Sequence, residues 1–206
     1  MIVDMLHLEH VIGAKEAADL WNVTEGHMKN LCAANEVMAK KIGNTWVIEK
    51  NQPHVGIKQH LKIITGAPFI KSSSIFYTYD EYKKVVINYI ASFDEYVRDE
   101  KKSEMTNDDY QQYFWSGDKI NKILSIEPAR ILNKFPETNE VDIILPFNGK
   151  THKVFVKRES LNQYLGYKIE DLSFKEHTWH EKFLKDTASK HQRVAFVKQF
   201  SQEERK

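Results

Sequence analysis

The chain has 206 residues, of which 41% are hydrophobic and 29% are charged, and its formal net charge is +1 at pH 7. This balance is typical of a folded globular protein and excludes a disordered tail or a strongly basic nucleic-acid coat. The single cysteine, Cys32, excludes an internal disulfide and a zinc site built from several cysteines of one chain.

The N-terminal sequence, MIVDMLHLEHV, has no basic segment ahead of an apolar run, and Asp4, His7 and Glu9 interrupt it. It therefore lacks the pattern of a signal peptide. No uninterrupted apolar stretch approaches the ~20 residues that cross a bilayer. We expect the protein to be cytoplasmic, with no membrane contact.

Residues 14–33, AKEAADLWNVTEGHMKNLCA, have the apolar spacing of two helices that cross at a tight turn. Ala17 and Ala18 are small where the helices would meet. Met28 and Leu31 recur at helical spacing on the second helix and would face the first. The pattern predicts a helix-turn-helix.

The turn between these helices has its own signals. Asn22 takes the position where glycine is usual, and asparagine tolerates the left-handed backbone conformation. Thr24 is a natural N-cap, so the second helix is expected from Glu25 to about Asn35.

A hairpin is expected after the second helix. Residues 40–49 alternate loosely around Gly43 and Asn44, which have the form of a two-residue turn between short strands. The candidates for the buried face of this hairpin are Ile42, Trp46 and Ile48.

Together these features resemble the winged helix-turn-helix domains of the MerR and excisionase-like superfamily. Three pieces of sequence carry the resemblance: AKEAA at 14–18, LC at 31–32 and KKIGNTW at 40–46. It covers about the first quarter of the chain and does not extend to residues 57–206. It implies a DNA-binding domain whose second helix lies in the major groove and whose hairpin is the wing.

The resemblance also implies which residues contact DNA. Those at the start of the second helix are Thr24, Glu25, Gly26, His27, Lys29 and Asn30, and those of the wing are Lys40, Lys41 and Asn44. Asn30 can bond adenine through both amide atoms and Lys29 can reach guanine, whereas Gly26 would let the backbone approach a phosphate. Lysines on a hairpin contact phosphate without reading sequence. The alternative is that the lysines are an ordinary solvated surface.

The charge of this region argues for modest affinity. The first 56 residues carry five Lys and no Arg against seven Asp and Glu, which leaves a formal charge of −2. Counterion release at a basic stripe usually provides much of the affinity of a DNA-binding domain. We therefore expect dimerisation through the rest of the chain, which would double the contacts.

The middle of the chain predicts a connector followed by a long helix. Residues 56–76 are broken by glycines, a proline and a serine run, with one short helix expected at 57–64. Thr78, with Glu81 three residues later, has the form of a capping box. Apolar residues then recur at steps of three and four as far as Val97, which predicts a core-facing helix of about five turns. A dimer seam is the alternative use of this stripe.

The last part of the chain predicts a mixed, mainly helical domain with one β-hairpin. Pro128 interrupts the helical pattern of 118–135, so two short helices are expected there. Asn148 and Gly149, between two apolar runs, are a strong hairpin signal. Further helices are expected at 160–165 and 176–189, and the last apolar run, 194–200, suits a strand or a helix end.

Two patterns suggest catalysis only weakly. His177 and His180 are three residues apart on an expected helix, which is a weak metal signal. Asp142 and Lys157 are spaced as in some metal-dependent nucleases, but Phe155 stands where the second carboxylate is needed. We therefore expect no enzymatic activity, no cofactor and no metal.

The predicted fold class is α+β, with a winged helix-turn-helix domain at 1–55, a connector at 56–76 and a larger domain at 77–206. The larger domain would dimerise the chain or bind an effector or a protein partner. The predicted function is sequence-specific binding of double-stranded DNA by a homodimeric transcriptional regulator of a bacterium, plasmid or phage. The alternative is a phage or mobile-element inhibitor, similar in layout to some anti-CRISPR proteins, whose C-terminal domain binds a host protein. A third possibility, an excisionase-like architectural role, usually belongs to much shorter proteins.

Overall fold

The structure is a computed structural model that describes residues 11–21, 23–34, 37–50, 54–77, 83–99 and 104–202. The chain divides into two compact units, Met1–Ile63 and Ile64–Lys206. Each unit combines helices with an antiparallel or mixed β-sheet, so the fold class is α+β as expected. No helix among the described residues is both long enough and apolar enough to span a bilayer.

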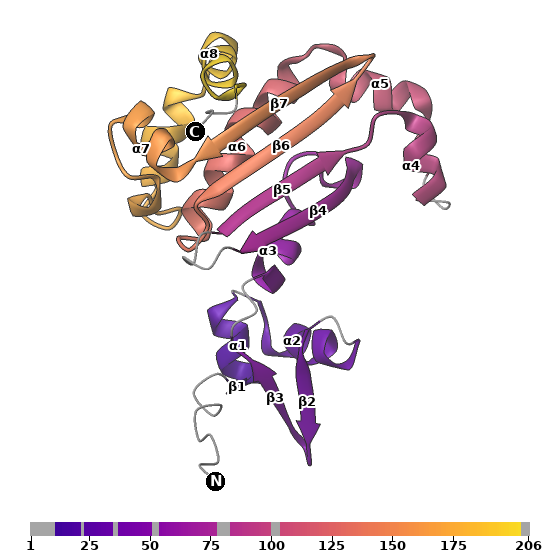
Figure 1. Cartoon of the computed structure of the whole chain (residues 1–206), viewed down its shortest axis with the longest axis vertical. Helices are drawn as coiled ribbons and strands as arrows, with labels where there is room; N and C mark the ends of the chain where they lie inside the picture. The colour runs from indigo at the N-terminus through magenta and orange to yellow at the C-terminus, as the bar shows by residue number, and fades with distance from the viewer. Residues whose placement is uncertain are drawn as a thin grey trace. The chain divides into compact units, whose positions relative to one another are not determined.

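The first unit packs helices against a three-stranded sheet (Figure 1). Its strands are β1 (Val11–Gly13), β2 (Ala39–Ile42) and β3 (Thr45–Glu49). Its helices are α1 (Ala14–Leu20), α2 (Glu25–Ala33) and α3 (His54–Leu61). Strand β3 lies in the middle and pairs antiparallel with both neighbours.

Small residues allow α1 and α2 to lie close together. Ala17 and Ala18 of α1 are almost fully buried in the same core as Met28 and Leu31 of α2. A methyl group at the contact lets two helix backbones approach, while the larger side chains fill the space beneath them. Cys32 belongs to this core, and burial raises the pKa of its thiol, so the group stays uncharged at neutral pH.

The start of α2 is as the sequence predicts. The hydroxyl oxygen of Thr24 accepts a hydrogen bond from the backbone N–H of His27 at 3.2 Å, which confirms the N-cap. The helix ends at Ala33, two residues before the expected end. Asn22, at the predicted turn, and Asn35 lie outside the described residues.

The β2–β3 hairpin is also confirmed, with Gly43 in the left-handed region at φ 59°. Ile48 is fully buried and Trp46 packs against the core. The expectation for Ile42 was wrong, because its side chain is 60% exposed. Ile42 pairs with Thr45 directly beside the turn, at the end of the hairpin where the core no longer covers the strands.

The second unit is built on a four-stranded sheet in the order β4-β5-β6-β7. Its strands are β4 (Ile70–Tyr77), β5 (Lys83–Tyr89), β6 (Glu140–Phe147) and β7 (Lys150–Lys157). Strands β5 and β6 are parallel and the other two pairs are antiparallel.

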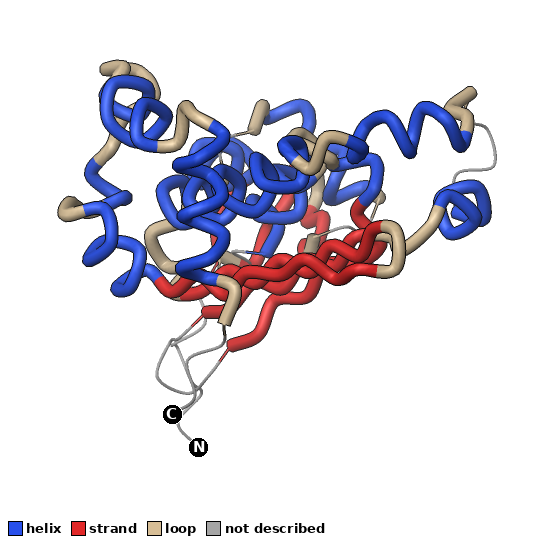
Figure 2. Tube along the Cα trace, turned by 90° about the horizontal axis from the view of Figure 1, so that it is seen from above, coloured by secondary structure: helices blue, strands red, loops and turns tan. Residues whose placement is uncertain are grey.

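Helices gather on one side of this sheet (Figure 2). The α-helices are α4 (Phe93–Asp99), α5 (Asn107–Trp115), α6 (Asp118–Lys134), α7 (Arg158–Leu165) and α8 (Lys190–Phe200). Shorter pieces are the 3-10 turns η2 (Ala67–Phe69) and η3 (Ile169–Asp171) and the π-helix η4 (Trp179–Leu184). Helix α6 lies against β6 and β7.

The long helix expected from Thr78 to Val97 does not form. Its middle is strand β5, in which buried and half-buried residues alternate, and only its end is helical, as α4. The apolar residues of this stretch fit a two-residue period as well as a helical one, and pairing with β4 and β6 on both sides favours the strand. The expected capping box at Thr78 lies outside the described residues.

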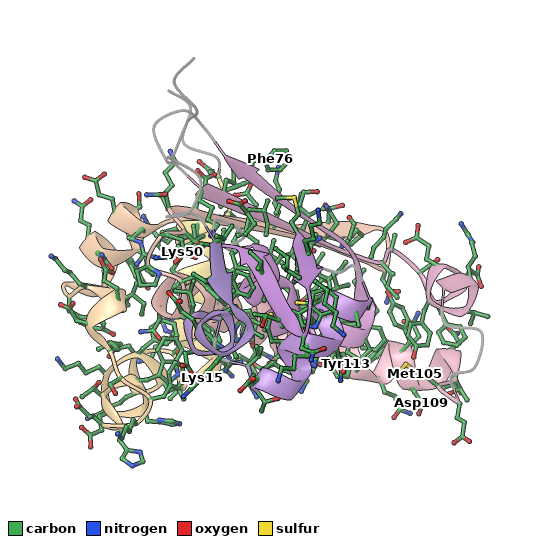
Figure 3. The ribbon with its side chains drawn as sticks, turned by 90° about the horizontal axis from the view of Figure 1, so that it is seen from below. Lys15, Lys50, Phe76, Met105, Asp109 and Tyr113 are labelled. Atoms are coloured by element: carbon green, nitrogen blue, oxygen red, sulfur yellow. The ribbon has the colours of Figure 1, made fainter. Side chains whose placement is uncertain are left out.

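The expected connector at 56–76 is another correction, because it contains the end of α3, the turn η2 and most of β4. Strand β4 lies at the edge of the sheet, where polar residues are tolerated, and this explains why its serine run resembled a loop. Phe76, near the end of β4, is 55% exposed and extends away from the sheet (Figure 3).

Pro128 does not split its helix, since α6 runs through it for 17 residues. A proline inside a helix costs about 3 kcal/mol, and burial of the apolar side of α6 offsets that cost. The hairpin at Asn148 and Gly149 is confirmed, with both residues at positive φ. The helix expected at 160–165 is α7, and residues 194–200 belong to α8.

Candidate nucleic-acid interface

Helix α2 turns one side to the core of its unit and the other to solvent. Met28, Leu31 and Cys32 are buried. The exposed residues at its start are Thr24, Glu25, Gly26, His27, Lys29 and Asn30. An α-helix makes one full turn every 3.6 residues. Positions 26, 29 and 30 therefore form the centre of the exposed side, and positions 25 and 27 flank it. The structure therefore brings the six predicted helix residues to one exposed surface.

Lys29 and Glu25 form an ion pair on this surface. The ammonium of Lys29 lies 2.7 Å from a carboxylate oxygen of Glu25, and both side chains are about half exposed. The hydrogen bond from Lys29 lowers the pKa of Glu25, which therefore stays ionised. An exposed pair of this kind is weak, so Lys29 can leave it for a stronger anion at little cost. Glu25 itself would repel a phosphate.

Gly26 has no evident role within the fold. A Cβ built at this position would meet no described atom within 4 Å, and the backbone there is not in the left-handed region. Glycine inside a helix is less stable than alanine. Gly26 therefore lowers the stability of α2 slightly and leaves its backbone open to close approach by another molecule.

The β2–β3 hairpin carries the other predicted contacts. Lys40, Lys41 and Asn44 are all exposed, with Asn44 in the turn. Neighbouring residues of a strand point to opposite sides, so the hairpin presents one ammonium on each side. The ammonium of Lys41 lies 5.9 Å from the centre of the Trp46 ring, a distance at which the attraction is weak. Both lysines are therefore available to phosphate.

His177 and His180, which gave the weak metal signal in the sequence, are both exposed. Their rings lie 6.1 Å apart in the second unit, and His177, two residues before η4 begins, has a positive φ of 61°. Among the described residues, no group of three or more His, Cys, Asp or Glu side chains is placed to hold a metal ion.

The second unit does contain a carboxylate cluster that the sequence did not indicate. Asp142 and Glu140 project from the same side of β6, and the ammonium of Lys84 on β5 lies 2.6 Å from Asp142 and 2.8 Å from Glu140. Burial and the neighbouring Glu140 carboxylate raise the pKa of Asp142 to about 6, although Lys84 opposes the shift. Lys84 occupies the place between the carboxylates that a cation would need. The cluster is therefore an ion triad with two buried carboxylates and a half-buried lysine, and Lys157 pairs across the strands with Glu140 and not with Asp142.

The chain matches no protein-family model, no curated protein and no solved structure in the comparisons made. A function for the surface of α2 and for the β2–β3 hairpin is therefore inferred from the chemistry of their own residues.

Proposed function

We propose that the first unit is a winged helix-turn-helix domain that binds double-stranded DNA, as part of a transcriptional regulator of a bacterium, plasmid or phage. Helix α2 would enter the major groove, and the β2–β3 hairpin would be the wing. The observation that most supports this proposal is the division of α2 into two sides. Gly26, Lys29 and Asn30 lie together on the exposed side, and the opposite side is buried. A recognition helix needs such a buried side to hold it on its domain and such an exposed polar side to face the major groove.

In this proposal the exposed residues have different tasks. The amide of Asn30 would bond an adenine edge, and Lys29 would leave Glu25 for a guanine or a phosphate. The backbone at Gly26 would approach the DNA closely. Lys40 and Lys41, on opposite sides of the hairpin, would contact phosphates of the two strands that border a groove. Thr24, His27 and Asn44 would complete the contact surface.

The charge of the unit limits how tightly one copy can bind. Its first 56 residues carry a formal charge of −2, and one of its five lysines is paired with Glu25. Few phosphates would be neutralised, so a single domain would bind DNA weakly at physiological salt. Two copies on paired half-sites about one helical turn apart would bind far more tightly, because the second contact is then intramolecular. We therefore propose that the regulator acts as a homodimer.

The experiment that tests this proposal is selection of bound fragments from random double-stranded DNA by the full-length protein, followed by affinity measurements over a range of salt concentrations. The proposal expects enrichment of a paired sequence and a steep loss of affinity as salt rises. A chain that enriches no sequence at physiological salt would contradict it. That result would favour the alternative function, in which the second unit binds a host protein.

A further inference from the structure

The sheet of the second unit has two edge strands, β4 and β7. Among the described residues, β4 pairs with β5 alone, and the backbone of residues 71–77 makes no hydrogen bond beyond that pairing. Every second residue of an edge strand turns its N–H and C=O groups away from the neighbouring strand. The outer side of β4 therefore presents a row of open donors and acceptors that suits another strand.

The two edges differ in how they are protected against such pairing. Lys150, Lys153 and Lys157 lie along β7, and lysines on an edge strand oppose pairing with another chain. On β4 the only charged residue is Lys71, and its ammonium lies 2.9 Å from the carboxylate of Glu95. The rest of β4 consists of serines, isoleucines and aromatic residues, with no proline. Strand β4 thus lacks the devices that protect β7.

The side chains of β4 also leave room for a second strand. Ser72, Ser74 and Phe76 are all exposed, and they pair with the half-buried residues of β5. They therefore lie on the side of the sheet that the helices do not cover. Phe76 is 55% exposed and extends away from the sheet (Figure 3). A large apolar ring beside small serines gains free energy if a neighbouring strand covers it.

We propose that β4 pairs antiparallel with β4 of a second copy of the chain, which joins two four-stranded sheets into one sheet of eight strands. This inference rests on the proposed function, because it names the surface through which the proposed homodimer forms. A two-fold axis at Ser74 sets the two Ser74 residues opposite each other and Phe76 opposite Ser72 of the partner subunit. The pair satisfies the open backbone groups of both strands and lowers the exposure of both Phe76 rings.

Charge favours pairing of β4 with its own copy over pairing of β7 with its own copy. In the proposed pair the two Lys71 residues are six residues apart along the strands, or about 20 Å, so salt screens their repulsion. A β7 pair centred on Phe155 would set Lys153 opposite Lys157 of the partner subunit, and a pair centred on Lys153 would set that residue opposite its own copy. Like charges directly opposite each other destabilise a strand pair.

The spacing of the proposed pair also suits a protein that binds two DNA half-sites. The first unit ends at Ile63 and β4 begins at Ile70, so a short segment attaches each first unit to the start of its β4. In the pair centred on Ser74, the two Ile70 residues are eight residues apart along the strands, or about 27 Å. Half-sites one turn of DNA apart are separated by about 34 Å. The two attachment points are therefore spaced nearly as neighbouring half-sites are.

The test is analytical ultracentrifugation of the full-length protein without DNA, in which the parent should be a dimer at micromolar concentration. Ser74→Lys and Ser74→Glu each place like charges opposite each other at the two-fold axis, so each should weaken the dimer by at least about tenfold. An equimolar mixture of the two variants should restore the dimer, because the charges that face each other are then opposite. Ser74 is exposed in the single chain, so both variants should keep the circular dichroism spectrum of the parent.

Thr151→Lys is the matched control, because it adds the same charge at an exposed position of the other edge strand, and it should dimerise as the parent does. Phe76→Ala is a second variant of β4, and it should also weaken the dimer because it removes the ring that the second copy covers. The proposal is overturned if the parent is a monomer, if both Ser74 variants dimerise as the parent does, or if their mixture stays monomeric. None of these results bears on DNA binding by the first unit, which selection from random DNA tests separately.

Discussion

The two units use their polar side chains in opposite ways. In the second unit, buried and half-buried charged groups hold helices and loops together. In the first unit, the polar side chains of α2 and of the β2–β3 hairpin point to solvent, and Lys29 shares its charge only with Glu25. A side chain that is bonded inside the fold is not available to a partner. The comparison therefore supports the proposal that the first unit is the part of the chain that binds DNA.

Arg158 shows how the second unit uses a charge. Its guanidinium donates to the carbonyl oxygens of Leu132 at 2.6 Å, Phe135 at 3.1 Å and Thr138 at 2.7 Å, and it pairs with Glu170 at 3.0 Å. These carbonyls lie at the end of α6 and in the loop after it, where no helical N–H remains to bond them. Arg158 therefore closes the end of the longest helix.

Arg193 has the same role at the start of that helix. Its guanidinium lies 2.6 Å from a carboxylate oxygen of Asp118, the first residue of α6, and it donates to the carbonyl oxygen of Thr187 at 2.9 Å. The hydrogen bond with Arg193 holds the pKa of Asp118 below its usual range. Both ends of α6 are thus tied by arginines from later segments.

The largest expected effect is a loss of stability in Arg158→Ala. Removing the guanidinium takes the side-chain donor from the carbonyls of Leu132 and Thr138 and the cation from Glu170, so the free energy of unfolding should fall by about 3 kcal/mol. Chemical denaturation of the full chain, followed by circular dichroism, measures it. The control is Lys175→Ala, an exposed cation of the same unit, which should change stability by less than about 0.5 kcal/mol. Equal losses of unfolding free energy in the two variants would show that Arg158 contributes no more to stability than the exposed Lys175 does.

The second effect is pH-dependent and concerns the ion triad of Asp142, Glu140 and Lys84. Burial raises the pKa of Asp142 to about 6, above the value of roughly 3.9 in an unfolded chain. The folded state thus holds the proton more tightly, and the stability this provides is full below about pH 4 and is lost as pH rises through 6. Over this window the parent should lose about 2 kcal/mol of stability relative to Asp142→Asn, in which this group no longer titrates. If the stability of the parent and of Asp142→Asn changed with pH in the same way, the raised pKa would not belong to Asp142.

In the first unit the expected effects are on binding and not on stability. Lys40→Ala combined with Lys41→Ala should weaken binding to preferred and random DNA alike, by about tenfold, and should reduce the salt dependence by about two counterions. Fluorescence anisotropy at several salt concentrations measures both. Lys175→Ala combined with Lys185→Ala removes the same charge from exposed positions of the second unit. If this control loses as much affinity, the hairpin lysines have no special role.

Asn30→Ala should have a smaller effect that depends on sequence. The lost pair of hydrogen bonds to a base should weaken binding to the preferred site by about fivefold more than binding to random DNA. Competition between the two DNA sequences measures this ratio directly. A uniform loss would assign Asn30 to the phosphate backbone.

The smallest effect is expected for Gly26→Ala, where stability and binding should change in opposite directions. Alanine favours the helix, so the free energy of unfolding should rise by up to about 0.5 kcal/mol. The added methyl group meets nothing in the described structure, yet it should weaken DNA binding about threefold if the backbone approaches the DNA. Gly13→Ala, at another open glycine of this unit, should leave binding unchanged. Unchanged binding in Gly26→Ala would show that the backbone of α2 stays away from the DNA.

Several features could be predicted from the sequence because a few neighbouring residues decide them. Thr24 caps α2 because its hydroxyl reaches the backbone three residues on. Asn148 and Gly149 form a hairpin turn because both tolerate positive φ. The exposed side of α2 follows from the spacing of its apolar residues. These predictions needed no contact with distant parts of the chain.

Other features could not be predicted, because distant residues decide them. The apolar pattern of 83–97 suits a helix or a strand, and residues 83–89 become β5 because β6, more than fifty residues later, pairs with them in parallel. Pro128 remains inside α6 because burial of that helix outweighs the local cost.

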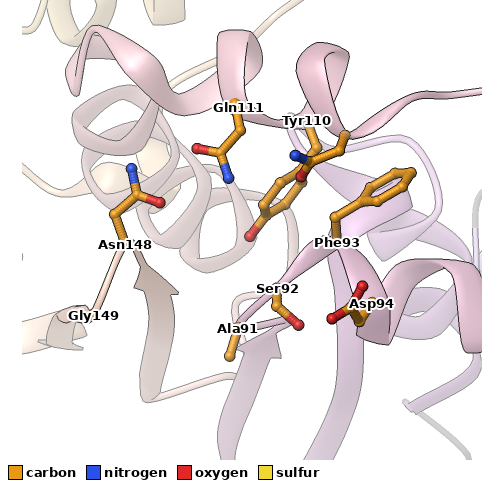
Figure 4. A pocket seen from close by; sticks show the side chains of 9 residues that line it. Ala91, Ser92, Phe93, Asp94, Tyr110, Gln111, Asn148 and Gly149 are labelled. Atoms are coloured by element: carbon orange, nitrogen blue, oxygen red, sulfur yellow. The ribbon is translucent and has the colours of Figure 1, made fainter.

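The sequence by itself therefore determined the helices α1 and α2, the β2–β3 hairpin and the exposed surface of α2, since short-range caps, turns and helical periodicity define them. Tertiary structure alone decided the sheet of the second unit, the arginine contacts at both ends of α6 and a pocket that Tyr110 helps to line. That pocket is lined by residues 91–94, 107, 110–111 and 148–149 (Figure 4), whose proximity comes from strand pairing and helix packing and leaves no local pattern in the sequence.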